Sequence, residues 1–198
     1  MDAGAWRLWQ SAGVLSPQSL SEQDRRLVAG WAADCAERVL PLFEAEAPAD
    51  DRPRDAIERA RAFARGELST AGEIRRRFVA GRAAHSATSP AGGAAARAAA
   101  QAAGVAHMGA HALGAAAYAA TAAGLASRDS AADAADELTW QLQQVTPQIA
   151  AALRKLPPVG EDSAGPLGPG RLASGDLGQH IRRIQASLTT AGDDVGTD

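Results

Sequence analysis

Two groups of residues in this chain have types and spacings that could carry chemistry. His107 and His111 lie four positions apart, so that on one continuous helix both imidazoles would face the same side, at a spacing that suits a metal ion. No glutamate directly follows His107, and no acidic third ligand lies close by in the sequence. Two interpretations stay open: a ligand-binding pair, or two partly buried histidines that brace a helix junction.

The second group is the densest charge cluster of the chain, residues 50–67. Its carboxylates could support metal-assisted cleavage of a phosphodiester, whereas the arginines between them favour ion pairing and helix capping. A small metal-dependent hydrolase or nuclease built from His107, His111 and the Asp50/Asp51 pair is therefore one alternative function. The chain has no phosphate-binding loop of the Gly-x-x-x-x-Gly-Lys type, which excludes an ATP-driven nuclease.

The same cluster is predicted to form a complete helix. Asp50 and Asp51 are N-cap candidates, and Gly66 is placed to end the helix in the left-handed conformation. Between them, apolar residues recur at the spacing of one buried stripe. The stripe consists of Ala56, Ile57, Ala60, Phe63 and Ala64.

The rest of the chain repeats this pattern of capped, amphipathic segments, with no alternating pattern of the kind that strands show. Ser21, with Asp24 three residues on, is expected to cap the first helix, and Pro41 is expected to end or kink it. The sequence therefore predicts an all-α fold: a compact single domain of six or seven helices with a flexible C-terminal tail. The helices are expected at 21–43, 50–67, 70–84, 94–106, 111–126, 131–145 and 149–156.

The sequence predicts three regions along the chain. Residues 1–20, which include Trp6 and Trp9, are a weakly patterned lead-in, and residues 21–156 form the all-α domain. Residues 157–198 are a Pro/Gly-rich linker followed by a short amphipathic tail. The apolar residues of the tail predict either a helix that docks on something or a marginal helix on its own. They are Leu177, Ile181, Ile184 and Leu188.

Composition narrows the function classes. The net charge of −3 and the isoelectric point of about 5.8 argue against an electrostatic grip on nucleic acid. The least polar window is mostly alanine and glycine and contains two histidines, so no membrane span is expected. A single cysteine, Cys35, excludes an internal disulfide and fits the reducing cytoplasm, and its position on an apolar face indicates a small buried side chain. The N-terminus lacks the pattern of a secretion signal.

Several segments resemble, in the same order, the immunity-protein-five-like family of bacterial polymorphic toxin systems. The resemblance covers roughly residues 20–155, and its two signature pieces are the segments around Asp51 and around His107. Some members of the family also carry a nuclease label. The matching segments are Trp31–Ala36, Asp50–Arg54, Ala56–Glu58, Ala64–Glu67, His107–Met108 and His111–Ala116.

The resemblance implies a non-enzymatic, cytoplasmic protein that binds and neutralises a cognate toxin. No cofactor is expected, and no tightly bound metal, because the histidine pair lacks a visible third ligand. We expect Asp51, Arg54, His107 and His111 to bind the partner or to organise the site. A more specific hypothesis is that Arg54 is partly buried and organises a pocket near the two histidines. A helical scaffold without a catalytic site is a further alternative. The oligomeric state does not follow from the sequence.

Overall fold

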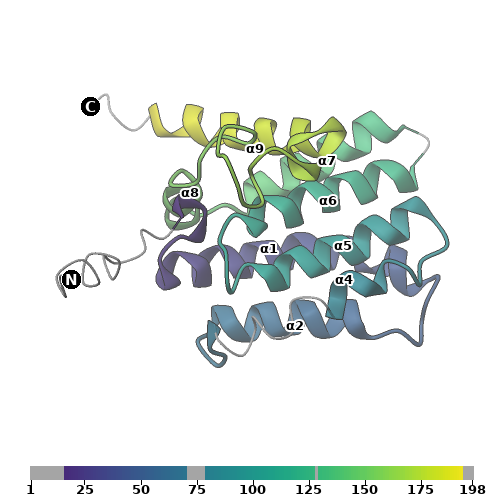
Figure 1. Cartoon of the computed structure of the whole chain (residues 1–198). Coiled ribbons are helices and arrows are strands. Elements are labelled where there is room, and N and C mark those ends of the chain that lie inside the picture. The colour runs from purple at the N-terminus through teal and green to yellow at the C-terminus, as the bar shows by residue number, and fades with distance from the viewer. Residues whose placement is uncertain (1–15, 71–78, 128, 194–198) are drawn as a thin grey trace, which may run out of the picture.

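The computed structural model describes residues 16–70, 79–127 and 129–193, and every regular element in these ranges is a helix (Figure 1). The all-α prediction is confirmed. The described elements are the 3₁₀ turns η2 (Pro17–Ser19) and η3 (Arg171–Ala173) and the α-helices α1 (Glu22–Glu44), α2 (Arg52–Ala64), α4 (Val79–Ala83), α5 (Pro90–Gly104), α6 (His111–Ala126), α7 (Ser130–Gln143), α8 (Pro147–Leu153) and α9 (Gly175–Asp193).

Helix α6 lies at the centre of the fold. All residues from Ala112 to Ala120 are buried, and α1, α5, α7 and α9 pack around the helix. A helix that is apolar all round must be covered on every side. Alanine and glycine allow the neighbours to come close: Gly114, for example, leaves the space that the Gln101 side chain occupies. The core is therefore built from short side chains with a few large anchors.

Helix α1 carries two of the sequence predictions. The Ser21 hydroxyl accepts a hydrogen bond from the backbone N–H of Asp24 at 3.1 Å, which confirms the predicted cap. Pro41 was expected to end or kink the helix, yet α1 continues to Glu44. The pyrrolidine ring of Pro41 faces solvent, while Phe43 is fully buried and anchors the last turn. This packing offsets the one backbone hydrogen bond that proline removes.

Helix α2 is the predicted charged helix, and its apolar stripe faces the core as expected. Gly66 follows the helix with φ of 84°, the left-handed conformation that the sequence indicated. The buried residues of α2 are Pro53, Ala56, Ile57, Ala60 and Phe63.

Two helices begin earlier than predicted because of their N-terminal caps. Helix α5 begins at Pro90 rather than near 94, since the Ser89 hydroxyl accepts a hydrogen bond from the N–H of Gly92 and proline suits a first turn. Helix α8 begins at Pro147 rather than at Ile149, after a Thr146 cap.

The C-terminal region contacts the domain. Residues 157–170, expected to belong to a linker, contain no helix, but Leu167 is fully buried and its backbone N–H donates to the Gln18 side chain at 2.8 Å. Helix α9 buries Ile181, Ile184 and Leu188 in the same hydrophobic cluster as α1 and α6. The tail helix thus docks on the chain's own domain, and one core spans both sides of the boundary predicted after residue 156.

Some predictions fall outside the described residues. They are the placement of Trp6 and Trp9 and most of the helix expected at 70–84, with its arginines at 75–77. Within the described ranges, no helix combines the length and the apolar character that crossing a membrane requires.

The packing of α9 gives a first prediction. Ile184→Ala is expected to lower the free energy of unfolding by about 2–5 kcal/mol, because the truncated side chain leaves a cavity against α6. Urea denaturation measures the change. Thr190→Ala, on the exposed side of the same helix, is the control and should change stability little. If residues 157–198 behave as a detached tail in solution, the two variants will be equally stable.

Candidate interaction surface

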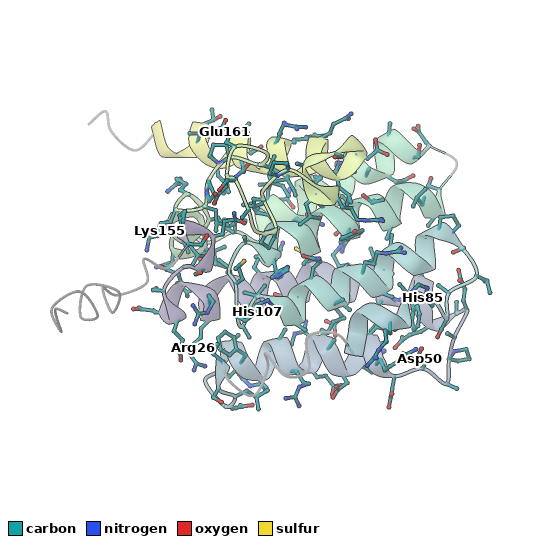
Figure 2. All side chains as sticks on the ribbon, viewed as in Figure 1. Arg26, Asp50, His85, His107, Lys155 and Glu161 are labelled. Atoms are coloured by element: carbon teal, nitrogen blue, oxygen red, sulfur yellow. The ribbon has the colours of Figure 1, made fainter. Side chains whose placement is uncertain are left out.

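The two signature segments lie at opposite ends of helix α5. Asp50 lies beside the loop that leads into α5, and His107 follows the helix directly. Fifteen residues at 1.5 Å each separate these ends by about 22 Å. Figure 2 shows Asp50 and His85 at one end of the molecule and His107 towards the other. The metal site considered above, which needs His107, His111 and the Asp50/Asp51 pair together, is therefore not assembled.

At the first end, the loops 44–51 and 85–89 are joined by side chains, and we call residues 44–54 and 85–89 the loop end. Glu46 provides one joint. Its carboxylate accepts hydrogen bonds from the backbone N–H groups of Thr88 at 2.7 Å and Ser89 at 2.9 Å, and from both hydroxyls. The Ser89 hydroxyl and these other donors lower the pKa of Glu46 to about 2. A carboxylate from one loop thus caps the helix that starts in the other.

Asp50 and Arg52 provide the second joint. The Arg52 guanidinium donates to both Asp50 oxygens, at 2.7 Å from Nε and 2.5 Å from Nη2, and also reaches the Ser86 hydroxyl at 3.0 Å. The hydrogen bond from Arg52 is the main reason that the pKa of Asp50 falls to about 2. Asp50 is thus occupied in holding the loop end together.

Arg54 and Asp51 differ from Asp50 because they are displayed at the surface. Arg54 donates to the two oxygens of Glu44 at 2.8 and 2.7 Å, and its side chain is 51% exposed. The expectation that Arg54 is partly buried beside the histidines is therefore wrong: the pairing with Glu44 holds it at the other end of α5. Asp51 is exposed in the N-cap position of α2, and its side chain makes no capping hydrogen bond.

The histidines form a compact polar junction between α5 and α6. His111 Nδ1 lies 2.7 Å from Gln101 Oε1, and because an amide oxygen can only accept, Nδ1 carries the proton. Gly104 leaves room for the imidazole of His111, and the rings of His107 and His111 lie 5.0 Å apart between centroids. Burial, followed by the nearby His107, lowers the pKa of His111 to about 3. His111 is therefore a neutral brace at the junction.

The described residues contain no group of three or more histidine, cysteine, aspartate or glutamate side chains that could hold a metal ion. Cys35 is fully buried, and burial raises the pKa of its thiol well above the usual value. Its place in the core agrees with the interpretation of Cys35 as a small hydrophobic residue.

The partners of these residues could not be predicted from the sequence. Glu44 and Glu46 lie between the first two predicted helices, and they hold Arg54 and the start of α5. Glu137 is 5% exposed and pairs with Arg38 at 2.9 Å. Each pair joins different elements, so no local spacing in the sequence could have indicated it.

Comparison with known proteins supports the resemblance seen in the sequence. The model of the family described as "Imm-5 like putative immunity protein" matches residues 18–148, and the chain belongs to this family. The matched region runs from the buried Gln18 through α7 and includes both signature segments, whereas α9 lies outside it. No curated protein and no solved structure matches the chain.

The Glu46 joint generates a second prediction. Glu46→Gln is expected to lower the melting temperature at pH 7, because a neutral amide is a weaker acceptor and does not complement the positive end of α5. The folded-state pKa of about 2 is below the ordinary 4.5, so this stabilisation is present above pH 4.5 and is lost as the pH falls towards 2. Glu58→Gln, at an exposed position on α2, is the control. Wild-type melting of Glu46→Gln at pH 7 would contradict the capping role.

The His111 junction generates a third prediction. Its folded-state pKa of about 3 is below the ordinary 6.5, so His111 favours the folded state above pH 6.5, and this contribution declines as the pH falls. Between pH 6.5 and 4.5 the decline should reach up to about 1.4 kcal/mol per pH unit in urea denaturation. His111→Asn, whose amide can still donate to Gln101, should reduce this slope. The exposed His85 gives the control, His85→Asn, which should keep it.

Proposed function

We propose that this protein neutralises a cognate toxin by direct protein–protein binding, as its family description suggests, and that the loop end is the surface that binds. The observation that carries this proposal is that Asp51 and Arg54, from a signature segment, are exposed at the start of α2, beside loops that internal pairs hold in place. A surface fixed before binding loses little conformational entropy when the partner arrives.

The chemistry of the loop end suits an interface. Small apolar residues, including Pro48 and Ala49, are exposed between the charged pairs. An apolar centre with a polar rim is the usual anatomy of a protein interface. Arg54 keeps an exposed face while Glu44 fixes its orientation, so it can contact a partner's carboxylate or aromatic ring without first being ordered. Asp51 offers a carboxylate to a partner's cation.

In this proposal the histidines act on the fold. His111 positions the junction of α5 and α6 through Gln101, and that junction lies a helix length away from the loop end. Their part in the family signature then reflects the packing of α5 on α6. Because the protein is acidic overall and has a single buried cysteine, we place its action in the cytoplasm, on a protein rather than a nucleic acid.

The fourth prediction tests this surface with a toxin domain identified by mapping the neighbouring genes. The wild-type protein is expected to protect cells that express the toxin and to bind the purified domain in calorimetry. Asp51→Lys and Arg54→Glu should each raise the dissociation constant more than about tenfold, which is 1.4 kcal/mol. Their melting temperatures should stay close to the wild-type value, because exposed ion pairs contribute only about 0–1 kcal/mol.

A double variant separates recognition from folding. Glu44→Arg/Arg54→Glu keeps an internal ion pair but reverses both charges, so it should fold like the wild type and still lose binding. If the variants bind the toxin as well as the wild type does, the signature residues serve the fold alone, as in the scaffold alternative. If the wild type neither binds the toxin nor protects the cells, the proposed function is wrong.

A further inference from the structure

Helix α9 presents a polar stripe beside a hollow that the toxin-binding proposal does not use. The hollow has a volume of about 370 Å³ and lies between the end of α6, the start of α7 and the first half of α9. Leu125, one of the few large apolar side chains exposed among the described residues, lines it and is 51% exposed. The wall that α9 contributes consists of Asp176, Gln179, His180 and Arg183.

The two charges of this stripe do not satisfy each other. Asp176 and Arg183 are seven residues apart, which on a helix is about 10.5 Å along the axis. They share one side of α9, because seven residues make nearly two full turns. Within the described residues neither side chain takes part in an ion pair or a side-chain hydrogen bond, although several other surface arginines do. Two opposite charges, at a fixed separation on one helix, are therefore available to pair with charges of a partner.

The arrangement of charges along the stripe is self-complementary under a two-fold rotation. Its midpoint falls between Gln179 and His180, with Asp176 and Arg183 equally far on either side. A second α9 lying antiparallel across this midpoint would place its Arg183 opposite Asp176 and its Asp176 opposite Arg183. A two-fold interface has this property: residue i of one copy meets residue j of the other, and j meets i.

We propose that this face of α9 binds the same face of a second copy of the chain, forming a two-fold symmetric dimer. The small residues of α7 beside the hollow, Ala131 and Ala135, allow close approach of the second copy. The contact also covers Leu125, and burial of its apolar surface would contribute to association.

This inference goes beyond the proposed toxin binding and does not depend on it. Helix α9 packs on α6 and α7, whereas α2 packs on α1, α4 and α5, and Figure 1 shows α9 and α2 on opposite sides of the molecule. A dimer through α9 therefore forms on the side of the molecule away from α2, which carries Arg54. The two copies would present two equivalent binding surfaces, which raises avidity for any partner that is itself clustered.

The fifth prediction concerns association of the full chain, measured by sedimentation equilibrium at low and high salt. The wild type is expected to show a monomer–dimer equilibrium that weakens with salt, because the pairs are exposed. Asp176→Arg or Arg183→Glu alone should raise the dimer dissociation constant at least about tenfold, since symmetry places a like-charge contact at two positions in the dimer. Combining the two reversals restores opposite charges across the axis and should return the constant to within about threefold of the wild-type value.

Controls keep the test decisive. Arg82→Glu, on α4, makes the same change of net charge at another exposed arginine and should leave association unchanged. Circular dichroism establishes that each variant remains folded. A wild type that stays monomeric at all concentrations overturns the proposal, as does a double reversal that remains as weak as the single variants.

Discussion

The burial of α6 on every side is the constraint on which the rest of the structure depends. Its side chains from Ala112 to Ala120 are nearly all small, and each buries little surface, so many close neighbours are needed to exclude water. Helices α1, α5, α7 and α9 supply that cover. Removing any of them would expose an apolar face of the central helix. The C-terminal helix is therefore part of the core although it lies outside the matched family region.

Close packing on α6 also fixes where the polar groups can be. The ends of the long helices lie at two poles of the bundle. The charged residues of the signature lie at the pole that contains the loop end. At one pole, the Glu46 carboxylate accepts hydrogen bonds from backbone N–H groups, and the Asp50 carboxylate holds Arg52. Both carboxylates therefore stabilise the fold. At the other pole, His111 is held neutral between α5 and α6. Polar residues brace both poles, and at the loop end Asp51 and Arg54 are also exposed to solvent.

This arrangement separates stability from recognition within one signature segment. Asp50 is committed to an internal pair, whereas its neighbour Asp51 is exposed without a capping bond. The charged stripe of α9 is a second exposed surface, on the opposite side of the fold from α2 (Figure 1). The two proposed interactions therefore use different sides of one continuous core.

The sequence by itself determined the class of fold, the family and most of the helices, because caps and apolar spacing act within a few residues. The Ser21 cap, the buried stripe of α2 and the turn at Gly66 could all be predicted in this way. Only the tertiary structure decided that α9 joins the core and that Arg54 pairs with Glu44 rather than approaching the histidines. These outcomes depend on which side chains meet across different elements. Packing and long-range electrostatics decide that, and neither can be read from local spacing.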